Sequence, residues 1–177
     1  MPCVRRNLES EPSEDLQDFS SCSVIKRVRP APTPPALFEA AWLNLAEGVE
    51  VELTSEDPER PIEGALLPDG TGGWRAATPG PQTISLIWAV PIRLHRIRLV
   101  FEELSQTRTQ EFVLRASTRT GNREIVRQQF TFSPPHTTIE REEYAAELAD
   151  VSRVQLEIIP AIDGGDAVAT LKEWRNA

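Results

Sequence analysis

The stretch that decides the fold runs from Asn44 to Trp74. It opens with Asn44-Leu45-Ala46-Glu47-Gly48-Val49-Glu50-Val51-Glu52-Leu53-Thr54-Ser55-Glu56-Asp57, continues with Pro61-Ile62-Glu63-Gly64-Ala65-Leu66, and ends with Pro68-Asp69-Gly70-Thr71-Gly72-Gly73-Trp74. Val49, Val51 and Leu53 alternate with acidic and polar residues, which predicts a half-buried strand with an acidic outer face. The Gly- and Pro-rich remainder predicts a loop that carries an acid, a hydroxyl and a tryptophan.

Short apolar segments follow this stretch at regular intervals. Leu94 breaks the alternation that Ile97, Leu99 and Phe101 set up, which predicts a β-bulge near His95, and Thr120-Gly121-Asn122 is typical of a hairpin turn. The predicted strands are 49–53, 83–88, 92–101, 112–116, 125–132, 138–147, 153–158 and 167–174. About eight short strands without a long helical pattern predict an all-β protein, an antiparallel β-sandwich of the jelly-roll type.

Composition narrows the class of partner. The 177 residues are 40% hydrophobic, carry a net charge of −8 and have a pI of about 4.9. A surface of that sign repels phosphate, so we expect neither nucleic acid nor an anionic membrane as a partner. No apolar run reaches the roughly 20 residues of a membrane span. No secretory signal is visible, so we expect a cytoplasmic protein if the chain is full length and an extracellular one if it is a mature fragment.

The first 36 residues differ from the rest. They hold six prolines and balanced charge, and they end in Pro30-Ala31-Pro32-Thr33-Pro34-Pro35, which predicts a flexible, proline-rich tail ahead of a domain at 37–177. Cys3 and Cys22 both fall in this tail, where they either pair with each other or remain thiols. Residues 37–48 fit both a short helix and an extended entry into the domain.

Several segments together carry a resemblance to a known family. Asn44-Leu45-Ala46-Glu47-Gly48-Val49 with Leu53-Thr54-Ser55-Glu56 resembles the opening strand of discoidin-type (coagulation-factor C-type) and galactose-binding-like domains. Ala65 to Trp74 resembles their Ala-x-Asp-Gly…Trp loop, and Ala167-Val168-Ala169-Thr170-Leu171-Lys172-Glu173 resembles their closing strand. The similarity spans residues 41–177, departs from the family at Thr83, Ile87 and Ala89, and implies a distant member with a jelly-roll fold.

The resemblance implies a structural calcium ion. In many members an early-loop Asp, a nearby hydroxyl, backbone carbonyls and a last-strand Glu hold this ion. The matching residues here are Asp69, Thr71 and Glu173. Calcium prefers 6–8 oxygen ligands, which tight turns can supply. The alternative is that Asp69 only caps a turn and Glu173 is solvated.

The resemblance also implies a sugar site, in which an aromatic ring stacks on the sugar and polar groups bind its hydroxyls. The loop residues that could do this are Trp74, Arg75, Arg119, Arg123 and His136. Each has a simpler interpretation, which is core packing for Trp74 and solvent exposure for the charged residues and His136. We therefore expect a non-catalytic module that binds a carbohydrate through loops at one end of the sandwich.

Catalysis has little support in the sequence. His95 and His136 lie in no nucleophile or metal pattern, and the domain region has no Cys. We interpret the acid pairs Glu102-Glu103 and Glu142-Glu143 as solvated charge, and we expect no enzyme. The second hypothesis is a protein-interaction or scaffold domain with the same fold, so the partner is either a glycan or another protein.

Overall fold

The computed structural model describes residues 41–177. The predicted tail 1–36, Cys3 and Cys22 lie outside the described residues. The elements are β1 (Val49–Leu53), α1 (Glu63–Leu66), β2 (Trp74–Pro79), β3 (Gln82–Glu102), β4 (Arg108–Thr118), β5 (Gly121–Phe132), β6 (Ile139–Ile159), β7 (Val168–Leu171) and β8 (Glu173–Asn176). No helix in this part of the chain is long and apolar enough to span a membrane.

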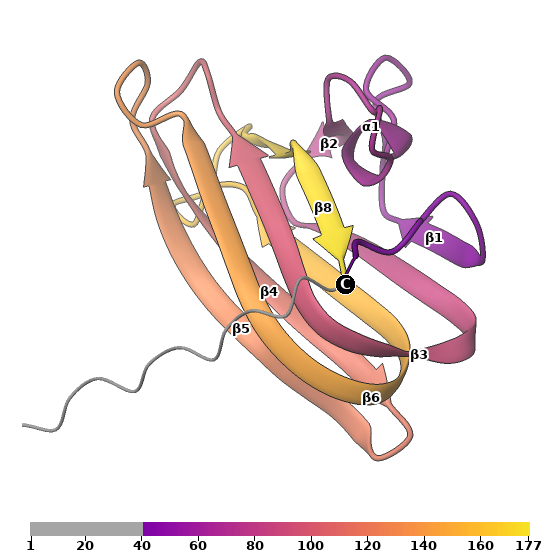
Figure 1. Cartoon of the computed structure of the whole chain (residues 1–177). Coiled ribbons are helices and arrows are strands. Elements are labelled where there is room, and N and C mark those ends of the chain that lie inside the picture. The colour runs from indigo at the N-terminus through magenta and orange to yellow at the C-terminus, as the bar shows by residue number, and fades with distance from the viewer. Residues whose placement is uncertain (1–40) are drawn as a thin grey trace, which may run out of the picture. The chain divides into compact units, whose positions relative to one another are not determined.

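The eight strands form an antiparallel β-sandwich, which confirms the predicted fold class (Figure 1). The larger sheet has the order β1-β3-β6-β4-β5, with β8 paired to the second half of β3, and β2 pairs with β7 in a two-stranded sheet. The strands β3 and β6 are 21 residues each and curve strongly through the molecule. Each therefore runs from one end of the sandwich to the other.

Irregular residues allow these long strands to bend. The β3–β6 register shifts between Leu94 and Arg96, which confirms the bulge predicted near His95. In β6, Glu147 and Asp150 have positive φ values of 45° and 57°, which non-glycine residues adopt at bulges and turns. The sequence predicted two strands in place of each long one because Pro91 interrupts one pattern and residues 148–152 interrupt the other. Each long strand continues through its interruption while the ladder pairing shifts, and in β6 Asp150 takes a positive φ at that point.

The core lies between the inner faces of the strands. Its largest fully buried side chains include Trp74, Trp174, Phe101, Phe112 and Phe132. The rings of Phe101 and Phe112 pack with centroids 4.9 Å apart. Val49, Val51 and Leu53 are half-buried against this core, while Glu50 and Glu52 are exposed, as the alternation of β1 predicted.

Three local expectations differ from the structure. Residues 41–48 form neither a helix nor a strand, but a short turn region tied to the C-terminus through the Leu43 N–H and the Asn176 carbonyl oxygen at 2.7 Å. The predicted last strand at 167–174 is two strands, β7 and β8, separated at Lys172. The loop that ends at Trp74 contains the short helix α1 and leads into β2, and neither was predicted.

Candidate functional site

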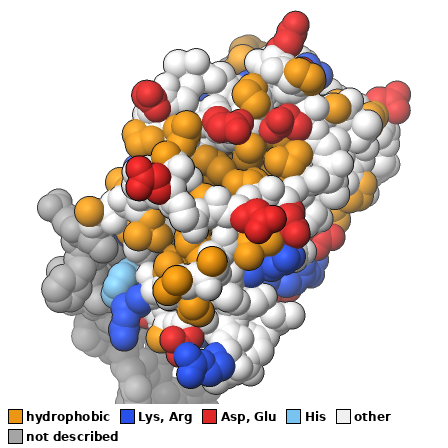
Figure 2. All heavy atoms as spheres, turned by 90° about the vertical axis from the view of Figure 1, so that its right-hand side faces the viewer, with side chains coloured by type: hydrophobic (Ala, Val, Ile, Leu, Met, Phe, Trp, Pro, Cys, Tyr) orange, Lys and Arg blue, Asp and Glu red, His pale blue; other side chains and the backbone are white. Residues whose placement is uncertain are grey.

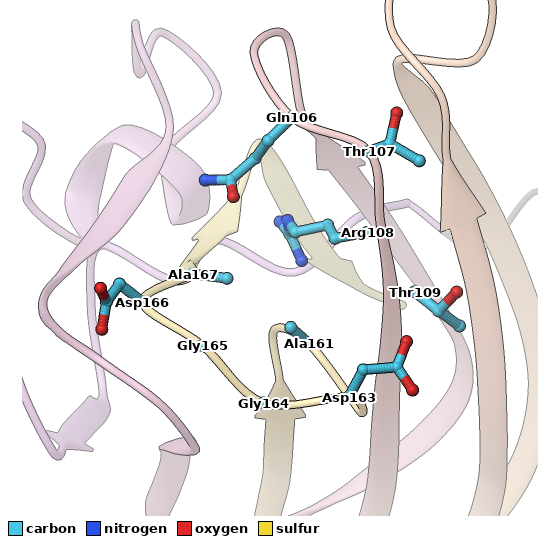
Figure 3. A pocket seen from close by; sticks show the side chains of 10 residues that line it. All are labelled: Gln106, Thr107, Arg108, Thr109, Ala161, Asp163, Gly164, Gly165, Asp166 and Ala167. Atoms are coloured by element: carbon cyan, nitrogen blue, oxygen red, sulfur yellow. The ribbon is translucent and has the colours of Figure 1, made fainter.

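A polar pocket lies where β3 ends and β4 begins. The loop 103–107 and the loop 160–167, which connects β6 to β7, enclose about 170 Å³ (Figure 3). We call it the Arg108 pocket, and its lining residues are Gln106, Thr107, Arg108, Thr109, Ala161, Asp163, Gly164, Gly165, Asp166 and Ala167.

Backbone hydrogen bonds hold the 160–167 loop in place. The Ile162 N–H donates to the Thr109 carbonyl oxygen at 2.9 Å, and the Gly164 N–H donates to the Ala161 carbonyl oxygen at 3.1 Å. Gly164 and Gly165 have φ values of 82° and 103°, a region that favours glycine. In the Asp163-Gly164-Gly165-Asp166 turn, the two glycines therefore separate the two carboxylates along the lower wall of the pocket.

Arg108 is the central side chain of the pocket. Its Nε donates to Glu103 Oε2 at 2.8 Å, and its Nη1 donates to Gln110 Oε1 at 3.0 Å and to the Pro160 carbonyl oxygen. The side chain is only 3% exposed. Its Nη2 has no hydrogen-bond partner among the described residues, although a buried donor normally has one. Figure 3 shows the guanidinium pointing into the space between Gln106, Ala161 and Ala167.

Glu103 holds the 103–107 loop in place and neutralises the charge of Arg108. Its Oε1 accepts hydrogen bonds from the N–H and hydroxyl of Ser105, each at 2.8 Å, and from the Gln106 N–H at 3.2 Å. Burial alone would raise the pKa of Glu103, but the hydrogen bonds from Arg108 and Ser105 outweigh it and lower the pKa to about 2. Glu103 is therefore ionised at neutral pH and balances the charge of Arg108.

The pocket suits an uncharged ligand with many hydroxyl groups. The Arg108 Nη2 offers a free donor, and the Gln106 amide offers a donor and an acceptor. The carboxylates of Asp163 and Asp166 lie at the rim and point away from the guanidinium (Figure 3). Because Glu103 already balances Arg108, these two carboxylates make the site negative and unfavourable for an anion.

The five residues predicted to bind a sugar do not form one site. Trp74 is 0% exposed, so its ring offers no face to a sugar, and the core-packing interpretation describes its position. Arg75 is exposed on β2, Arg119 lies in the β4–β5 turn and Arg123 near the start of β5. His136 follows the far end of β5, roughly 30 Å from Arg123 at the usual rise of a strand. None of the five lines the Arg108 pocket.

The predicted calcium ligands lie in the loop between α1 and β2 and at the start of β8. Asp69 and Thr71 are exposed, and Glu173 lies 3.9 Å from Arg98 in an ion pair. Among residues 41–177, no three His, Cys, Asp or Glu side chains come together as a metal site. The carbonyl oxygens of Ala65 and Leu67 instead accept hydrogen bonds from the Arg175 guanidinium at 3.2 and 2.8 Å, as does that of Leu66. The carbonyl oxygens at the end of α1 thus already face a positive charge.

The acid pairs are less solvated than the sequence suggested. Glu103 is buried with Arg108, and Glu143 bonds to both Arg96 and Arg98, at 3.0 and 3.1 Å. Adjacent acids on a strand face opposite sides, as expected, but one side in each pair meets protein groups. The interpretation as solvated charge is therefore wrong for Glu103, whereas Glu143 remains exposed while it pairs with the two arginines.

A second polar cluster was missed by sequence reasoning. Glu140, Glu142 and Tyr144 share the inner face of β6 and meet Gln128 of β5. The Gln128 Nε2 donates to Glu140 Oε1 at 3.2 Å and to Glu142 Oε1 at 2.7 Å, and the Tyr144 hydroxyl donates to Gln128 Oε1 at 2.7 Å. Burial, together with the charge of Glu142, raises the pKa of Glu140 to about 7. The i, i+2 spacing of these polar residues was the only sequence signal.

No protein-family model and no curated protein matches the chain. Several solved structures share the fold. CpGH89CBM32-4 of Clostridium perfringens, in complex with GlcNAc-α-1,4-galactose, has a TM-score of 0.55 and 14% identity over 77% of this chain and 94% of its own. The family 32 carbohydrate-binding module of C. perfringens NanJ, in complex with galactose, has a TM-score of 0.51 and 12% identity over 76% and 96%. SpGH29 has a TM-score of 0.55 and 16% identity over 76% of this chain but 27% of its own.

Proposed function

We propose that this domain is a non-catalytic carbohydrate-binding module and that the Arg108 pocket is its sugar site. The observation that carries the proposal is the free Nη2 of Arg108, a buried donor that points into a polar pocket. Two solved structures of the same fold are complexes with a sugar. That likeness supports a carbohydrate as the class of ligand, and the pocket chemistry supports where it binds.

The pocket dimensions and charge narrow the ligand. At about 170 Å³ it is smaller than the roughly 300–1,000 Å³ of typical small-molecule sites, so it fits one sugar ring at the end of a glycan. The negative rim favours a neutral sugar over a uronic acid. None of the lining residues is aromatic, so the stacking that strengthens many sugar sites is missing. We therefore expect weak binding, with a Kd of about 1 mM, or roughly −4 kcal/mol.

The test is a binding titration of the full chain. Galactose, N-acetylglucosamine, N-acetylgalactosamine and glucose would be compared with galacturonic acid by ligand-observed NMR, after a glycan array has ranked the terminal sugars. We expect at least one neutral sugar to bind about tenfold more tightly than the uronic acid. Arg108→Lys keeps the charge beside Glu103 but removes Nη2, and Gln106→Ala removes the second donor. Both should weaken binding by fivefold or more.

Asp69→Ala is the matched control, since it removes an exposed acid outside the pocket and should leave sugar affinity unchanged. Thermal melts of each variant separate a lost site from a lost fold. Unchanged sugar affinity in both pocket variants would show that the sugar binds elsewhere on the domain. A blank array together with silent titrations would reject the carbohydrate function and favour the protein-interaction alternative.

A further inference from the structure

A second hollow lies on the opposite side of the fold from β5, beside β1. It encloses about 420 Å³ between β1 and α1. Its lining residues are Leu45, Ala46, Val49, Val51, Leu53, Glu56, Ile62, Glu63, Leu66 and Leu67. Figure 2 shows apolar side chains at the base of a depression on this face and acidic side chains around it. We call it the β1 hollow, and it shares no residue with the Arg108 pocket.

The strand that borders the hollow has an open edge. Within residues 41–177, β1 pairs only with β3, in the register Val49↔Trp88, Val51↔Leu86 and Leu53↔Ile84. Its other edge presents backbone N–H and C=O groups that no described strand satisfies. An open edge is a template for another extended segment. Natural proteins often protect such an edge with charged side chains. The charged side chains of β1, Glu50 and Glu52, are exposed on its outer face, and the side chains that face the hollow are apolar.

The apolar face of β1 is incompletely covered. Val49, Val51 and Leu53 point toward the core, yet each is only half-buried because the hollow opens over them. The segment after β1 supplies the opposite wall through Ile62 and Leu66, both buried, and Leu67. A peptide that paired with β1 would project alternate side chains into this space.

Acidic residues predominate in the segment that forms the hollow, where Arg153 pairs with Glu52 at 3.0 Å and the Arg175 guanidinium contacts the Leu66 and Leu67 carbonyl oxygens. Residues 41–70 hold eight acids, which are Glu47, Glu50, Glu52, Glu56, Asp57, Glu59, Glu63 and Asp69, against the single base Arg60. Arg60 donates to the Gly72 carbonyl oxygen, so its guanidinium is engaged within the loop. Glu56 and Glu63 line the hollow directly. Such a concentration of carboxylates attracts cations and repels acidic partners.

We propose that the β1 hollow binds an extended peptide of a partner protein in which apolar residues alternate with Lys or Arg. The peptide backbone pairs with the open edge of β1, its apolar side chains enter the hollow, and its basic side chains meet the acidic rim. This is addition of a strand to a sheet edge, in which main-chain hydrogen bonds give affinity and alternate side chains give specificity. The interaction is independent of sugar binding, because the two sites have no lining residue in common.

The experiment uses the full chain and two labelled nine-residue peptides. One alternates Lys and Val, and the other alternates Glu and Val, so that only the charge differs. Fluorescence anisotropy at 50 and 300 mM NaCl should show that the basic peptide binds at least tenfold more tightly than the acidic one and that this difference shrinks in high salt. Hydrogen exchange should show slower exchange of the amides of residues 49–53 when the basic peptide is bound.

A charge-matched pair of variants locates the binding. Glu63→Lys on the rim should weaken the basic peptide by roughly threefold to tenfold. Glu124→Lys makes the same change in net charge on β5, at the other edge of the sheet, and should have little effect. Thermal melts confirm that both variants fold.

Five outcomes would overturn the proposal. Equal affinity for the two peptides would show that charge does not select the ligand. Binding without protection of residues 49–53, or equal losses in both variants, would place the peptide elsewhere. Binding of neither peptide would show that the β1 hollow is not a site for such peptides. Protection of residues 49–53 that rises with protein concentration alone would show that the edge pairs with a second copy of the chain.

Discussion

The Nη2 of Arg175 donates a hydrogen bond of 2.8 Å to the carbonyl oxygen of Leu67, 108 residues earlier in the chain. The Nη1 of the same side chain reaches the carbonyl oxygens of Ala65 and Leu66. One guanidinium thus satisfies the carbonyl groups at the end of α1 and ties them to β8. Helix ends leave such carbonyls without intrahelical donors, so Arg175 caps the C-terminal end of α1 with a side-chain donor.

We expect Arg175→Ala to lower the free energy of unfolding by about 2–3 kcal/mol. The reason is that three carbonyl oxygens lose a charged donor at a partly buried position. The melting temperature should fall by roughly 5–10 °C. Arg141→Ala is the control, because Arg141 is exposed on β6 and should change stability by less than about 0.5 kcal/mol. Equal effects of the two substitutions would contradict the role of Arg175.

The same contact predicts how the protein responds to calcium. If Arg175 supplies the positive charge of the loop, 5 mM CaCl₂ and 5 mM EDTA should leave the melting temperature unchanged. A calcium site at Asp69, Thr71 and Glu173 predicts the opposite. An ion present at 100 times its Kd would add about 2.7 kcal/mol and raise the melting temperature by several degrees. A clear rise of the melting temperature in calcium would support the calcium site.

The pairing of Glu103 with Arg108 predicts acid sensitivity. The folded pKa of Glu103, about 2, lies below the usual 4.5, so its contribution is complete above pH 4.5 and is lost as the pH falls toward 2. At pH 7, Glu103→Gln leaves Arg108 buried without its counter-ion and should cost about 3–5 kcal/mol. Chemical denaturation of both proteins from pH 7 to pH 2.5 should show the gap closing below pH 4.5. A gap that is independent of pH would argue against an ionised Glu103.

The strands were predictable because alternation reports burial directly. Val49, Val51 and Leu53 give β1 its inner face, and the parity break at Leu94 gives the bulge at His95. The site was harder to predict. Arg108 and Gln110 continue the inner face of Phe112 and Leu114, but a charged residue at such a position normally points to solvent. Its burial depends on the loop that folds around Glu103, which is a tertiary effect that local spacing does not encode.

The burial of Trp74 also could not be predicted from the local sequence. A tryptophan that follows Gly72-Gly73 in a loop resembles an exposed ligand contact as much as a core residue. The deciding fact is that the following residues form β2 and pair with β7, at Trp74↔Leu171 and Arg75↔Thr170. Because β7 lies almost 100 residues later, only the assembled sheet determines that the ring points inward.

Glu140 predicts a loss of stability as the pH rises from 4.5 to about 7. Its folded pKa of about 7 is above the usual 4.5, so stability is highest below pH 4.5, falls as the pH rises, and the loss is complete above pH 7. A shift of this size corresponds to about 3 kcal/mol. Glu140→Gln removes the ionisation beside Glu142 and Tyr144. It should be about 2–3 kcal/mol more stable than the wild type at pH 9 and similar at pH 4.5.

The control for this prediction is Glu50→Gln on the exposed face of β1, which should show no such dependence on pH. Urea denaturation at four pH values between 4.5 and 9 provides the measurement. If the wild type loses no stability relative to Glu140→Gln over this range, Glu140 does not titrate as inferred from its burial.

The glycine pair before Trp74 allows a matched test of how that residue is seated. Gly72 and Gly73 have φ values of 85° and 67°, so alanine should cost about 1 kcal/mol of backbone strain at either position. Their surroundings differ. A Cβ on Gly72 would meet nothing within 4 Å, whereas one on Gly73 would lie 2.6 Å from the Leu171 carbonyl oxygen and 2.9 Å from the Lys172 Cα. Neither backbone atom can move without disturbing the β2–β7 pairing.

Gly72→Ala should therefore cost only the strain of about 1 kcal/mol, and Gly73→Ala should cost at least about 3 kcal/mol. Because the clash falls on the residue paired with Trp74, the second variant should also shift the tryptophan fluorescence toward longer wavelength as a buried indole gains contact with water. Urea unfolding and the emission spectra measure both effects on the same samples. Equal losses in the two variants would mean that β7 moves aside at no cost, and that the close approach of Gly73 to Leu171 does not hold Trp74 in the core.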